Sequence, residues 1–362
     1  MLQLRDIAFT PLSVAYGAAG RARRALYRAG VLIVERVAAP VISVGNITAG
    51  GTGKTPLVEW LARAAAGEGR RVCILTRGYG RADASKRVIV SDGERILAEA
   101  HEGGDEPRLL AENLREQMVA VVSDANRVAA ARWALEHLRS DAFILDDGFQ
   151  HLRIARDLNI LTLDASDPWG GKALLPRGRL REPLGELKRA DLIVITRSEL
   201  ATDLEDVRSR AESLSGGGRP VLIARTATLG LKLLSTLSST PHSEATARAH
   251  EIGSVPQPLA AFCAIGNPQA FFSHARAEGL DINSTRPFAD HHVYTQSDVD
   301  ACVREAMRRG ARALLTTAKD AVKLRALDFA LPCYVLEVAL KFDEEQRMRA
   351  ILEEVLSRRR SI

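Results

Sequence analysis

One short stretch of the sequence combines the residue types that bind phosphate in nucleotide-binding proteins. Three glycines lead into Lys54 and Thr55, between a β-prone run that begins at Val41 and a helical run. In such loops, backbone N–H groups bind phosphate oxygens, the lysine contacts the β- and γ-phosphates, and the hydroxyl ligates Mg²⁺. The sequence therefore predicts a phosphate-binding loop made of Thr48, Ala49, Gly50, Gly51, Thr52, Gly53, Lys54 and Thr55.

The loop departs from the usual pattern at its first position, where Thr48 stands in place of a glycine. The stretch that follows matches instead the GGxGKT form of a known branch of these NTPases. In that branch, membrane-associated switch ATPases carry a lysine before the glycine pair. This chain has Ala49 there, which disfavours that subgroup.

A pair of carboxylates follows an apolar run in "FILDDGFQH", where Asp146 and Asp147 stand before Gly148. The end of such a strand is where an acidic partner for Mg²⁺ is expected beside a phosphate loop. The alternative is an Asp pair that opens a turn. Together with the phosphate loop, the pattern favours a metal role.

Three further stretches contain residues that could take part in catalysis, metal binding or phosphate recognition, but their spacing does not decide between these roles and structural ones. In "HEGGDEP", Asp105 and Glu106 are adjacent carboxylates, but they also suit the first turn of a helix. In "PFADHHVYT", His291 and His292 could be a metal pair, a catalytic group or a loop detail. In "LLPRGRLREP", the arginines suit phosphate recognition or a solvated loop: Arg177, Arg179 and Arg181.

The elements that must position these residues alternate along the chain. Apolar β-rich runs such as "RVCILT", "LNILTLD" and "DLIVIT" alternate with helical patterns, which is typical of a parallel sheet covered on both faces. We expect an α/β fold: a P-loop NTPase-type parallel sheet sandwiched by helices, with a second, smaller α/β/α domain. The expected boundaries are 1–225 for the first domain, 226–258 for a polar linker or insertion, and 259–362 for a second domain that closes over the cleft.

The charge of the chain is modest and concentrated at its beginning. The net charge is +5 over 362 residues, and residues 1–40 hold six arginines against two acidic residues. Nucleic-acid-binding domains more often carry a basic face over the whole domain, so no nucleic-acid partner is expected. The four cysteines contain no CxxC pair, and no apolar run approaches the ~20 residues that span a bilayer.

The basic beginning reads as an amphipathic helix over about residues 11–28, starting near Pro11. Arg21, Arg24 and Arg28 share one face, because they recur at i, i+3 and i+7. Apolar residues lie largely off that face: Leu12, Tyr16, Ala19 and Leu26. We expect this helix to lie on a membrane surface with its cations toward anionic headgroups. The alternative is an ordinary amphipathic helix docked on the domain.

Nine stretches in order along the chain resemble the tetraacyldisaccharide 4′-kinase family of lipid A biosynthesis. They are "PLSVAYG", "VISVGNITAGGTGKTP", "TRGYG", "GGDEP", "DDGFQH", "LLPRGRLREP", "AIGNPQAF", "FADHHVYT" and "TTAKDAVKL". The family's loop also carries threonine at the position of Thr48. A single fragment of this kind would mean little, but nine in sequence are specific.

The resemblance implies a reaction and a set of site residues. ATP with Mg²⁺ would phosphorylate the 4′-hydroxyl of a tetraacyl glucosamine disaccharide 1-phosphate and give the 1,4′-bisphosphate lipid A precursor. Asp105 would be the base acting with His291, and the Mg²⁺ environment would contain Thr55, Glu106, Asp146 and Asp147. The stretches that carry the resemblance also supply the candidate substrate-binding residues: Arg77, Tyr79, Gln150, His151, Arg177 and Arg179. The expected location is the cytoplasmic face of the inner membrane, with peripheral or monotopic attachment.

Two other functions remain to be weighed against this one. The first is a P-loop kinase or ligase that acts on a soluble small molecule, but such a substrate would not explain the basic segment at residues 1–40. A membrane-associated nucleotide switch is disfavoured by Ala49. Specificity for GTP is not supported, because Thr196-Arg197-Ser198-Glu199 stands where a guanine-reading Asn-Lys-x-Asp motif would be.

Overall fold

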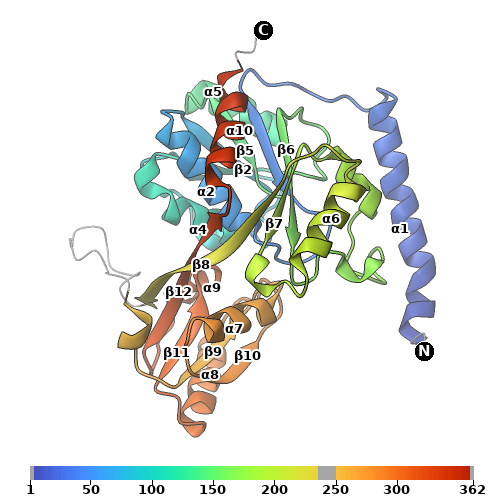
Figure 1. Ribbon diagram of the computed structural model, residues 1–362. Helices are drawn as coiled ribbons and strands as arrows, with labels where there is room; N and C mark the ends of the chain where they lie inside the picture. The colour runs from blue at the N-terminus through green and yellow to red at the C-terminus, as the bar shows by residue number, and fades with distance from the viewer. Residues whose placement is uncertain (1–3, 235–249, 359–362) are drawn as a thin grey trace.

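The computed structural model describes residues 4–234 and 250–358 and consists of two α/β lobes joined by a pair of long strands (Figure 1). Within these residues, twelve strands form one sheet in the order β10-β9-β11-β12-β8-β7-β6-β1-β5-β2-β4-β3. The order shows that a single sheet runs through both lobes.

The first lobe is built on parallel strands that are buried on both faces. These are β1 (Val41–Gly45), β2 (Val72–Thr76), β4 (Ala120–Ser123), β5 (Ala142–Leu145), β6 (Leu158–Asp164) and β7 (Leu192–Thr196). Burial on both faces explains why these strands appear as continuous apolar runs in the sequence. At the edge, β3 (Val88–Ser91) pairs antiparallel with β4.

Helices cover both faces of this part of the sheet. α2 (Lys54–Gly67), α4 (Asp105–Asn113) and α10 (Glu345–Ser357) share one hydrophobic cluster with Ile42 and Val44 of β1. α5 (Arg127–His137) packs on the opposite face against Val41, and α6 (Leu204–Leu214) covers that face near β7. The predicted sheet between helices is therefore confirmed.

The second lobe repeats this layering on a smaller scale. Its strands are β9 (Leu259–Cys263), β10 (Ile282–Pro287), β11 (Ala313–Thr317) and part of β12 (Cys333–Phe342). α8 (Gln296–Arg308) and α9 (Ala318–Leu324) share one core cluster, and α7 (Pro268–Ala277) contributes to another. This is the smaller α/β/α unit that the sequence predicts.

The expected boundaries need two corrections. Residues 226–233 form the second half of β8 (Val221–Leu233), which pairs antiparallel with β12, so a linker does not begin at 226. The following part of the expected linker, residues 235–249, lies outside the described residues. At the other end, α10 packs on α2 in the first lobe, because β12 carries the chain back and places Phe342 against Trp60 at 5.0 Å between ring centroids.

The N-terminal helix is longer than predicted. α1 (Leu4–Arg28) lies along the side of the first lobe and contains Pro11 within its length (Figure 1). Proline inside a helix removes one backbone hydrogen bond. Pro11 is exposed, and the helix begins seven residues before it, at Leu4, so the predicted start near Pro11 is wrong.

Candidate active site

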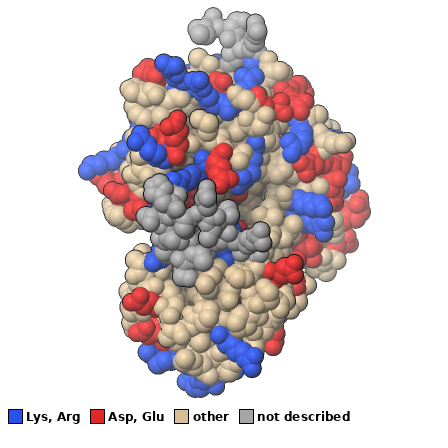
Figure 2. All heavy atoms as spheres, turned by 90° about the vertical axis from the view of Figure 1, so that its left-hand side faces the viewer, with Lys and Arg blue, Asp and Glu red and all other residues tan. Residues whose placement is uncertain are grey.

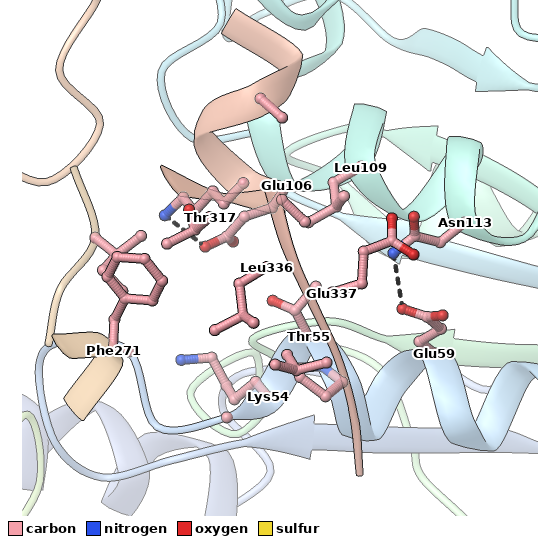
Figure 3. Close-up of a pocket in the computed structure, with 18 of the residues that line it drawn as sticks. Lys54, Thr55, Glu59, Glu106, Leu109, Asn113, Phe271, Thr317, Leu336 and Glu337 are labelled. Atoms are coloured by element: carbon pink, nitrogen blue, oxygen red, sulfur yellow. Dashed lines mark hydrogen bonds and ion pairs between the residues drawn. The ribbon is translucent and has the colours of Figure 1, made fainter. Parts of the chain in front are cut away.

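A cleft between the lobes contains the predicted phosphate-binding loop. Its cavity of about 1230 Å³ is lined by that loop, by α4, and by second-lobe residues near Gly266 and Lys319. Figure 3 shows Lys54 and Thr55 at the start of α2, with Glu106 and Thr317 facing them across the cavity. Figure 2 shows the surface hollowed between the lobes, with charged side chains of both signs gathered on the upper lobe beside the hollow.

The loop lies directly between β1 and α2 and opens onto this cleft. Gly53 precedes the helix with φ of 71°, and Gly50 has φ of 105°; both are conformations that L side chains rarely adopt. A Cβ atom on Gly50 would lie 2.6 Å from Nη2 of Arg179 and 3.2 Å from the carbonyl oxygen of Gly266, so Arg179 would have to move to admit a side chain. The backbone N–H groups at the start of α2 are thus free to meet a phosphate at the positive end of the helix.

The loop entrance explains the threonine that replaces the first glycine. Thr48 pairs with Leu180 as an isolated antiparallel bridge, and Ala49 N–H donates to the carbonyl oxygen of Arg179 at 2.6 Å. The guanidinium of Arg179 donates in return to the carbonyl oxygen of Ala49 at 2.9 Å. Because Thr48 has extended, paired backbone rather than a positive φ, no glycine is needed.

The far side of the loop is held by the segment after β7. Thr196 Oγ1 donates to the carbonyl oxygen of Thr52 at 2.9 Å, and Arg197 donates to that of Gly51 at 2.7 Å. Arg197 also pairs with Asp164. The segment in which a guanine-reading motif would stand therefore supports the loop.

Lys54 reaches the predicted metal carboxylates. Its Nζ lies 3.4 Å from Oδ1 of Asp147 and donates to Oδ1 of Asn46 at 3.3 Å. Asp147 also accepts from Arg181 at 2.8 Å. Burial works to raise the pKa of Asp147, but the charges of Lys54 and Arg181 outweigh it and lower the pKa to about 2.

Asp146 has the opposite environment. It is buried, and its Oδ1 has no hydrogen-bond partner within the described residues. Burial and the nearby charges of Glu106 and Asp147 raise its pKa to about 7. A cation near this carboxylate would relieve the repulsion between the acidic groups.

These carboxylates suit Mg²⁺ bound together with a nucleotide. Across residues 4–234 and 250–358, no group of three or more His, Cys, Asp or Glu side chains is arranged to hold a metal ion by itself. Mg²⁺ in kinases typically uses one or two carboxylates and completes its shell with water and phosphate oxygens. Asp146 and Asp147 next to Lys54 fit that pattern, with the hydroxyl of Thr55 at the same helix start.

The structure brings Asp105 and His291 together across the cleft. His291 Nδ1 lies 2.9 Å from Oδ2 of Asp105, although 186 positions separate them in the sequence. Asp105 is the first residue of α4 and is only 6% exposed. Lys323 Nζ is a second cation near it, at 3.8 Å from Oδ2.

The pairing changes the proton affinity of both groups. Burial alone would raise the pKa of Asp105, but the hydrogen bond with His291 and the charge of Lys319 outweigh it and keep this pKa below its ordinary value. The same hydrogen bond raises the pKa of His291 above its ordinary value, against burial and Lys319. Asp105 is therefore an ionised carboxylate at neutral pH that can accept a proton.

Asp105 does not cap its helix in the way the sequence alternative requires. Gly104 is the N-cap of α4, with φ of 104°, and the described residues give it no side-chain capping bond. The Asp105 side chain accepts only from the neighbouring Glu106 N–H among backbone donors in that range, at 2.9 Å. Gly104 instead allows close approach to the "TRGYG" stretch, since a Cβ there would lie 3.0 Å from Cα of Gly78.

Glu106 has a partner that the sequence reading missed. Lys319, in the "TTAKDAVKL" stretch, lies 2.9 Å from Oε1 of Glu106 and 3.2 Å from Oδ1 of Asp290. Its Nζ is also 3.5 Å from Nε2 of His291. Glu106 thus faces the cleft, held by a cation of the other lobe.

Among the candidate substrate residues, Gln150 and His151 are partly buried, whereas Arg77 and Tyr79 are exposed. Gln150 donates to the carbonyl oxygen of Asn46 at 2.8 Å, and His151 is a partly buried neutral group whose pKa burial and Arg127 lower to about 3. Arg77 stacks on Tyr79 at 5.5 Å, and both are exposed.

The two arginines chosen from the "LLPRGRLREP" stretch act on neighbouring elements in this arrangement. The backbone N–H of Arg177 donates to Oγ of Ser13 in α1 at 3.0 Å. The guanidinium of Arg179 contacts the loop and Asp167 rather than open space. Arg181, from the same stretch, is the arginine that contacts Asp147, one of the predicted metal ligands.

The face of α1 assigned to anionic headgroups needs a correction. Arg24 is buried and pairs with Glu182 at 3.2 Å and Glu186 at 2.9 Å, so it faces the protein. Helix periodicity groups residues on a face but does not say which face is docked. Arg21 and Arg28 remain exposed.

α1 and the segment after it expose large apolar side chains alongside the exposed Arg21, Arg23 and Arg28. Large exposed side chains gather there: Leu12, Val14, Tyr16, Leu26, Val31, Ile33 and Val34. We call these residues the apolar surface of α1. None of the helices in the described ranges is both long enough and apolar enough to cross a bilayer.

Comparison with protein families gives one match over nearly the whole chain. The model of the tetraacyldisaccharide-1-P 4′-kinase family matches residues 5–357. The tetraacyldisaccharide 4′-kinase of Geobacter metallireducens is 43% identical over 313 residues, which cover 86% of this chain and 87% of that protein. The enzyme of the same name from Chlorobium phaeovibrioides is 37% identical and covers 98% of both chains.

A solved structure agrees with the sequence comparison. The crystal structure of LpxK from Aquifex aeolicus in complex with ATP superimposes with a TM-score of 0.74 and 30% sequence identity. The match covers 98% of this chain and 100% of that one.

Proposed function

Because the chain belongs to the tetraacyldisaccharide-1-P 4′-kinase family, we propose that its two lobes divide the work of this kinase reaction between them. The enzyme is a tetraacyldisaccharide 4′-kinase of lipid A biosynthesis. It transfers the γ-phosphate of ATP to the 4′-hydroxyl of a tetraacyl glucosamine disaccharide 1-phosphate. The first lobe holds the nucleotide and the proton acceptor, and the second lobe supplies the group that orients that acceptor.

The loop from Thr48 to Thr55 binds the phosphates of ATP. Lys54 exchanges its contact with Asp147 for the β- and γ-phosphates, a move of one flexible side chain within the same pocket. Asp146, Asp147 and Thr55 would hold Mg²⁺, with Glu106 near them. Mg²⁺, when bound, neutralises charge on the transferred phosphoryl group.

Asp105 is the proton acceptor. The 4′-oxygen bonds to the γ-phosphorus as the bond from that phosphorus to ADP breaks, and the hydroxyl proton passes to Asp105. A sugar hydroxyl does not ionise at neutral pH, so a positioned base contributes about 10²–10⁴-fold. His291 fixes the carboxylate in one orientation through its Nδ1.

The acceptor lies over the first lobe, between Tyr79 and the loop. Tyr79 of "TRGYG" and Asp147 of "DDGFQH" line the cleft. Their neighbours Arg77, Gln150 and His151 are the proposed contacts to the sugar head. Arg177 and Arg179 contribute by holding α1 and the loop. The two lobes act as domains that close over ATP and exclude water from the transfer.

The apolar surface of α1 lies on the membrane that carries the lipid substrate. Seven large apolar side chains are exposed on this segment, and exposed apolar surface of this kind often marks a membrane or protein contact. Arg21 and Arg28 flank it and face anionic headgroups. We therefore propose that the enzyme works at the cytoplasmic face of the inner membrane, attached from one side.

The observation that carries the proposal is the contact of 2.9 Å between Asp105 and His291 over a cleft lined by the phosphate loop. The test uses purified full-length protein, radiolabelled ATP and the tetraacyldisaccharide 1-phosphate in detergent. Label should appear in a bisphosphorylated lipid whose 4′ position carries it. Lys54→Ala protein prepared in parallel serves as the inactive control.

The same assay without acceptor separates the alternative functions. A membrane-associated switch would hydrolyse ATP by itself when anionic vesicles are added. A kinase whose base is aimed at an acceptor hydroxyl should hydrolyse ATP slowly under both conditions. Rapid hydrolysis that no lipid acceptor changes would overturn the assignment of the base.

A further inference from the structure

Two short helices from opposite lobes face each other with opposite charge. α4 of the first lobe carries three carboxylates, and α9 of the second lobe with the residue after it carries three cations. The pairs across the gap are Asp105 with His291 and Lys323, Glu106 with Lys319, and Glu112 with Arg325. Asp105, Leu109 and Glu112 recur at i, i+4 and i+7, so they lie on one face of α4.

The Glu112–Arg325 contact has the geometry of a strong ion pair. Both guanidinium Nη atoms of Arg325 contact the two carboxylate oxygens of Glu112, with Nη1 at 2.6 Å from Oε1. Two parallel N–H···O bonds fix the relative orientation of the partners as well as their distance. The side chains are only 24% and 14% exposed, so water screens the pair weakly.

Glu112 is itself held in place within the first lobe. Arg108 Nε donates to Oε1 of Glu112 at 2.6 Å, and Arg108 Nη1 lies 2.8 Å from Glu99. The carboxylate is therefore preorganised to receive Arg325, and its rotamer freedom is already reduced before the lobes meet.

The pair lies toward the other end of α4 from Asp105. Seven residues separate Asp105 from Glu112, which is about 10 Å along the axis of α4. On the other side, Arg325 follows α9 directly, and Lys323 on that helix donates to the carbonyl oxygen of His292 at 3.1 Å. A shift of α9 along α4 would thus move the loop that carries His291.

We propose that Glu112 and Arg325 are positioning residues: their bidentate pair sets how the second lobe sits on α4, so that His291 meets Asp105. This inference rests on the proposed dyad of Asp105 and His291. Both residues line the cleft, and in this proposal they act through the placement of the lobes rather than through contact with ATP or acceptor. It raises the fraction of enzyme in which the two lobes are correctly placed.

The kinetic test compares Arg325→Gln, Glu112→Gln and the double variant with the full-length enzyme. Each single change should lower kcat/KM for the lipid acceptor about tenfold, which is within the usual range for coupling between distant sites. ATP affinity should stay unchanged. The double variant should be no worse than the poorer single variant, because both changes break one contact.

Two further variants separate positioning from loss of a surface charge. Arg325→Lys keeps the cation but not the fork, and should recover part of the activity. Arg210→Gln removes a similar cation that pairs with Asp206 within α6, and should behave as wild type. Wild-type kcat/KM in both Arg325→Gln and Glu112→Gln would overturn the proposal.

A distance measurement gives a readout that simple destabilisation does not move. The four native cysteines are buried, so spin labels can be placed on Glu136→Cys in α5 and Arg308→Cys in α8, both exposed positions. In Arg325→Gln the distribution of distances between the lobes should broaden, and in Arg210→Gln it should not. Lower kcat/KM with an unchanged distribution would also overturn the proposal.

The dyad is tested separately in the same assay. If Asp105→Asn retains wild-type turnover, the proposed base is wrong. If Asp105→Asn is inactive while Arg325→Gln and Glu112→Gln are fully active, the dyad stands and only the positioning role fails.

Discussion

Replacing Asp105 with asparagine removes a charge and leaves the shape of the side chain. The amide oxygen of the new side chain would still accept from the Glu106 N–H and contact His291, but the amide could not accept a proton from the sugar hydroxyl. We expect kcat to fall by about 10²–10⁴-fold, the usual contribution of a general base. ATP binding should be largely intact, because the phosphate contacts lie on Lys54 and Thr55.

The substitution should also cost stability. Asp105 is buried beside His291 and Lys323, and hydrogen bonds to charged groups contribute about 1.5–3 kcal/mol. The pKa of Asp105 is lowered in the folded protein, so its contribution is present above the ordinary carboxylate pKa and is lost as pH falls through the folded value. The pKa of His291 is raised, so its contribution is present below the ordinary imidazole pKa and is lost as pH rises through the folded value.

These signs fix where the effect of Asp105→Asn on unfolding is largest. Both contributions are complete only between about pH 4 and pH 6.5, the ordinary values of the two groups. The difference in free energy of unfolding between wild type and variant should therefore peak in that window and shrink toward pH 9. Urea titrations at several pH values and initial rates from the same preparations measure both effects.

If Asp105 and His291 act together, their substitutions should have non-additive effects on kcat. His291→Ala should lower kcat less than Asp105→Asn, with little added loss when the two are combined, because groups that act together are not additive. His292, on the same loop as His291, gives the control, because it contacts Asp298 of α8 at 3.2 Å instead of Asp105. His292→Ala should lower kcat less than His291→Ala. Retained kcat with lost stability in Asp105→Asn, or fully multiplicative losses, would refute the reasoning.

Three other predictions test the remaining parts of the site. Lys54→Ala should lose nearly all turnover, and Lys54→Arg should not restore it, since a planar fork does not replace an ammonium in this pocket; steady-state rates and ATP titrations decide this. Asp146→Asn should stabilise the metal-free protein, because the folded protein holds a proton on Asp146 that the unfolded chain releases. The gain over wild type should grow as pH rises from the ordinary carboxylate pKa to about 7 and reach at most about 4 kcal/mol. A difference in free energy of unfolding that is the same at pH 5 and pH 8, measured by urea titration, would contradict this. Leu12→Glu with Leu26→Glu should reduce sedimentation with anionic vesicles, whereas Met307→Glu on α8, which also replaces an exposed apolar side chain, should not; binding that neither change alters would exclude α1 as the anchor.

The phosphate loop and its sheet could be predicted because their signals are local. The loop, the strand before it and the helix after it are contiguous, and β5, which ends just before Asp146, pairs directly with β1. Strand burial on both faces leaves continuous apolar runs that are legible in a single sequence. The position of the metal carboxylates follows from the same neighbourhood of parallel strands.

The contacts between the lobes could not be predicted in this way. No periodicity links Asp105 to His291, and their pairing entered only through the family resemblance. Lys319, Lys323 and Arg325 were missed, since a cation on a short helix has no sequence sign of a partner two hundred residues away. The prediction of which face of α1 is exposed was wrong for a related reason. Arg24 pairs with Glu182 and Glu186, and the position of that distant segment cannot be deduced from helix periodicity.

The charges of the cleft are arranged so that each substrate displaces a contact rather than filling empty space. Lys54 and Arg181 neutralise Asp147, and Lys319 neutralises Glu106. When the phosphates of ATP draw Lys54 away, Asp147 loses a cation inside a buried site, which is costly unless another cation takes its place. The same exchange leaves Asp146 free to ionise beside that second cation, since its raised pKa comes from burial and neighbouring negative charge. A metal bound beside Asp146 and Asp147 would remove the electrostatic penalty that the nucleotide creates, so we expect the two to bind cooperatively without a preformed metal cage.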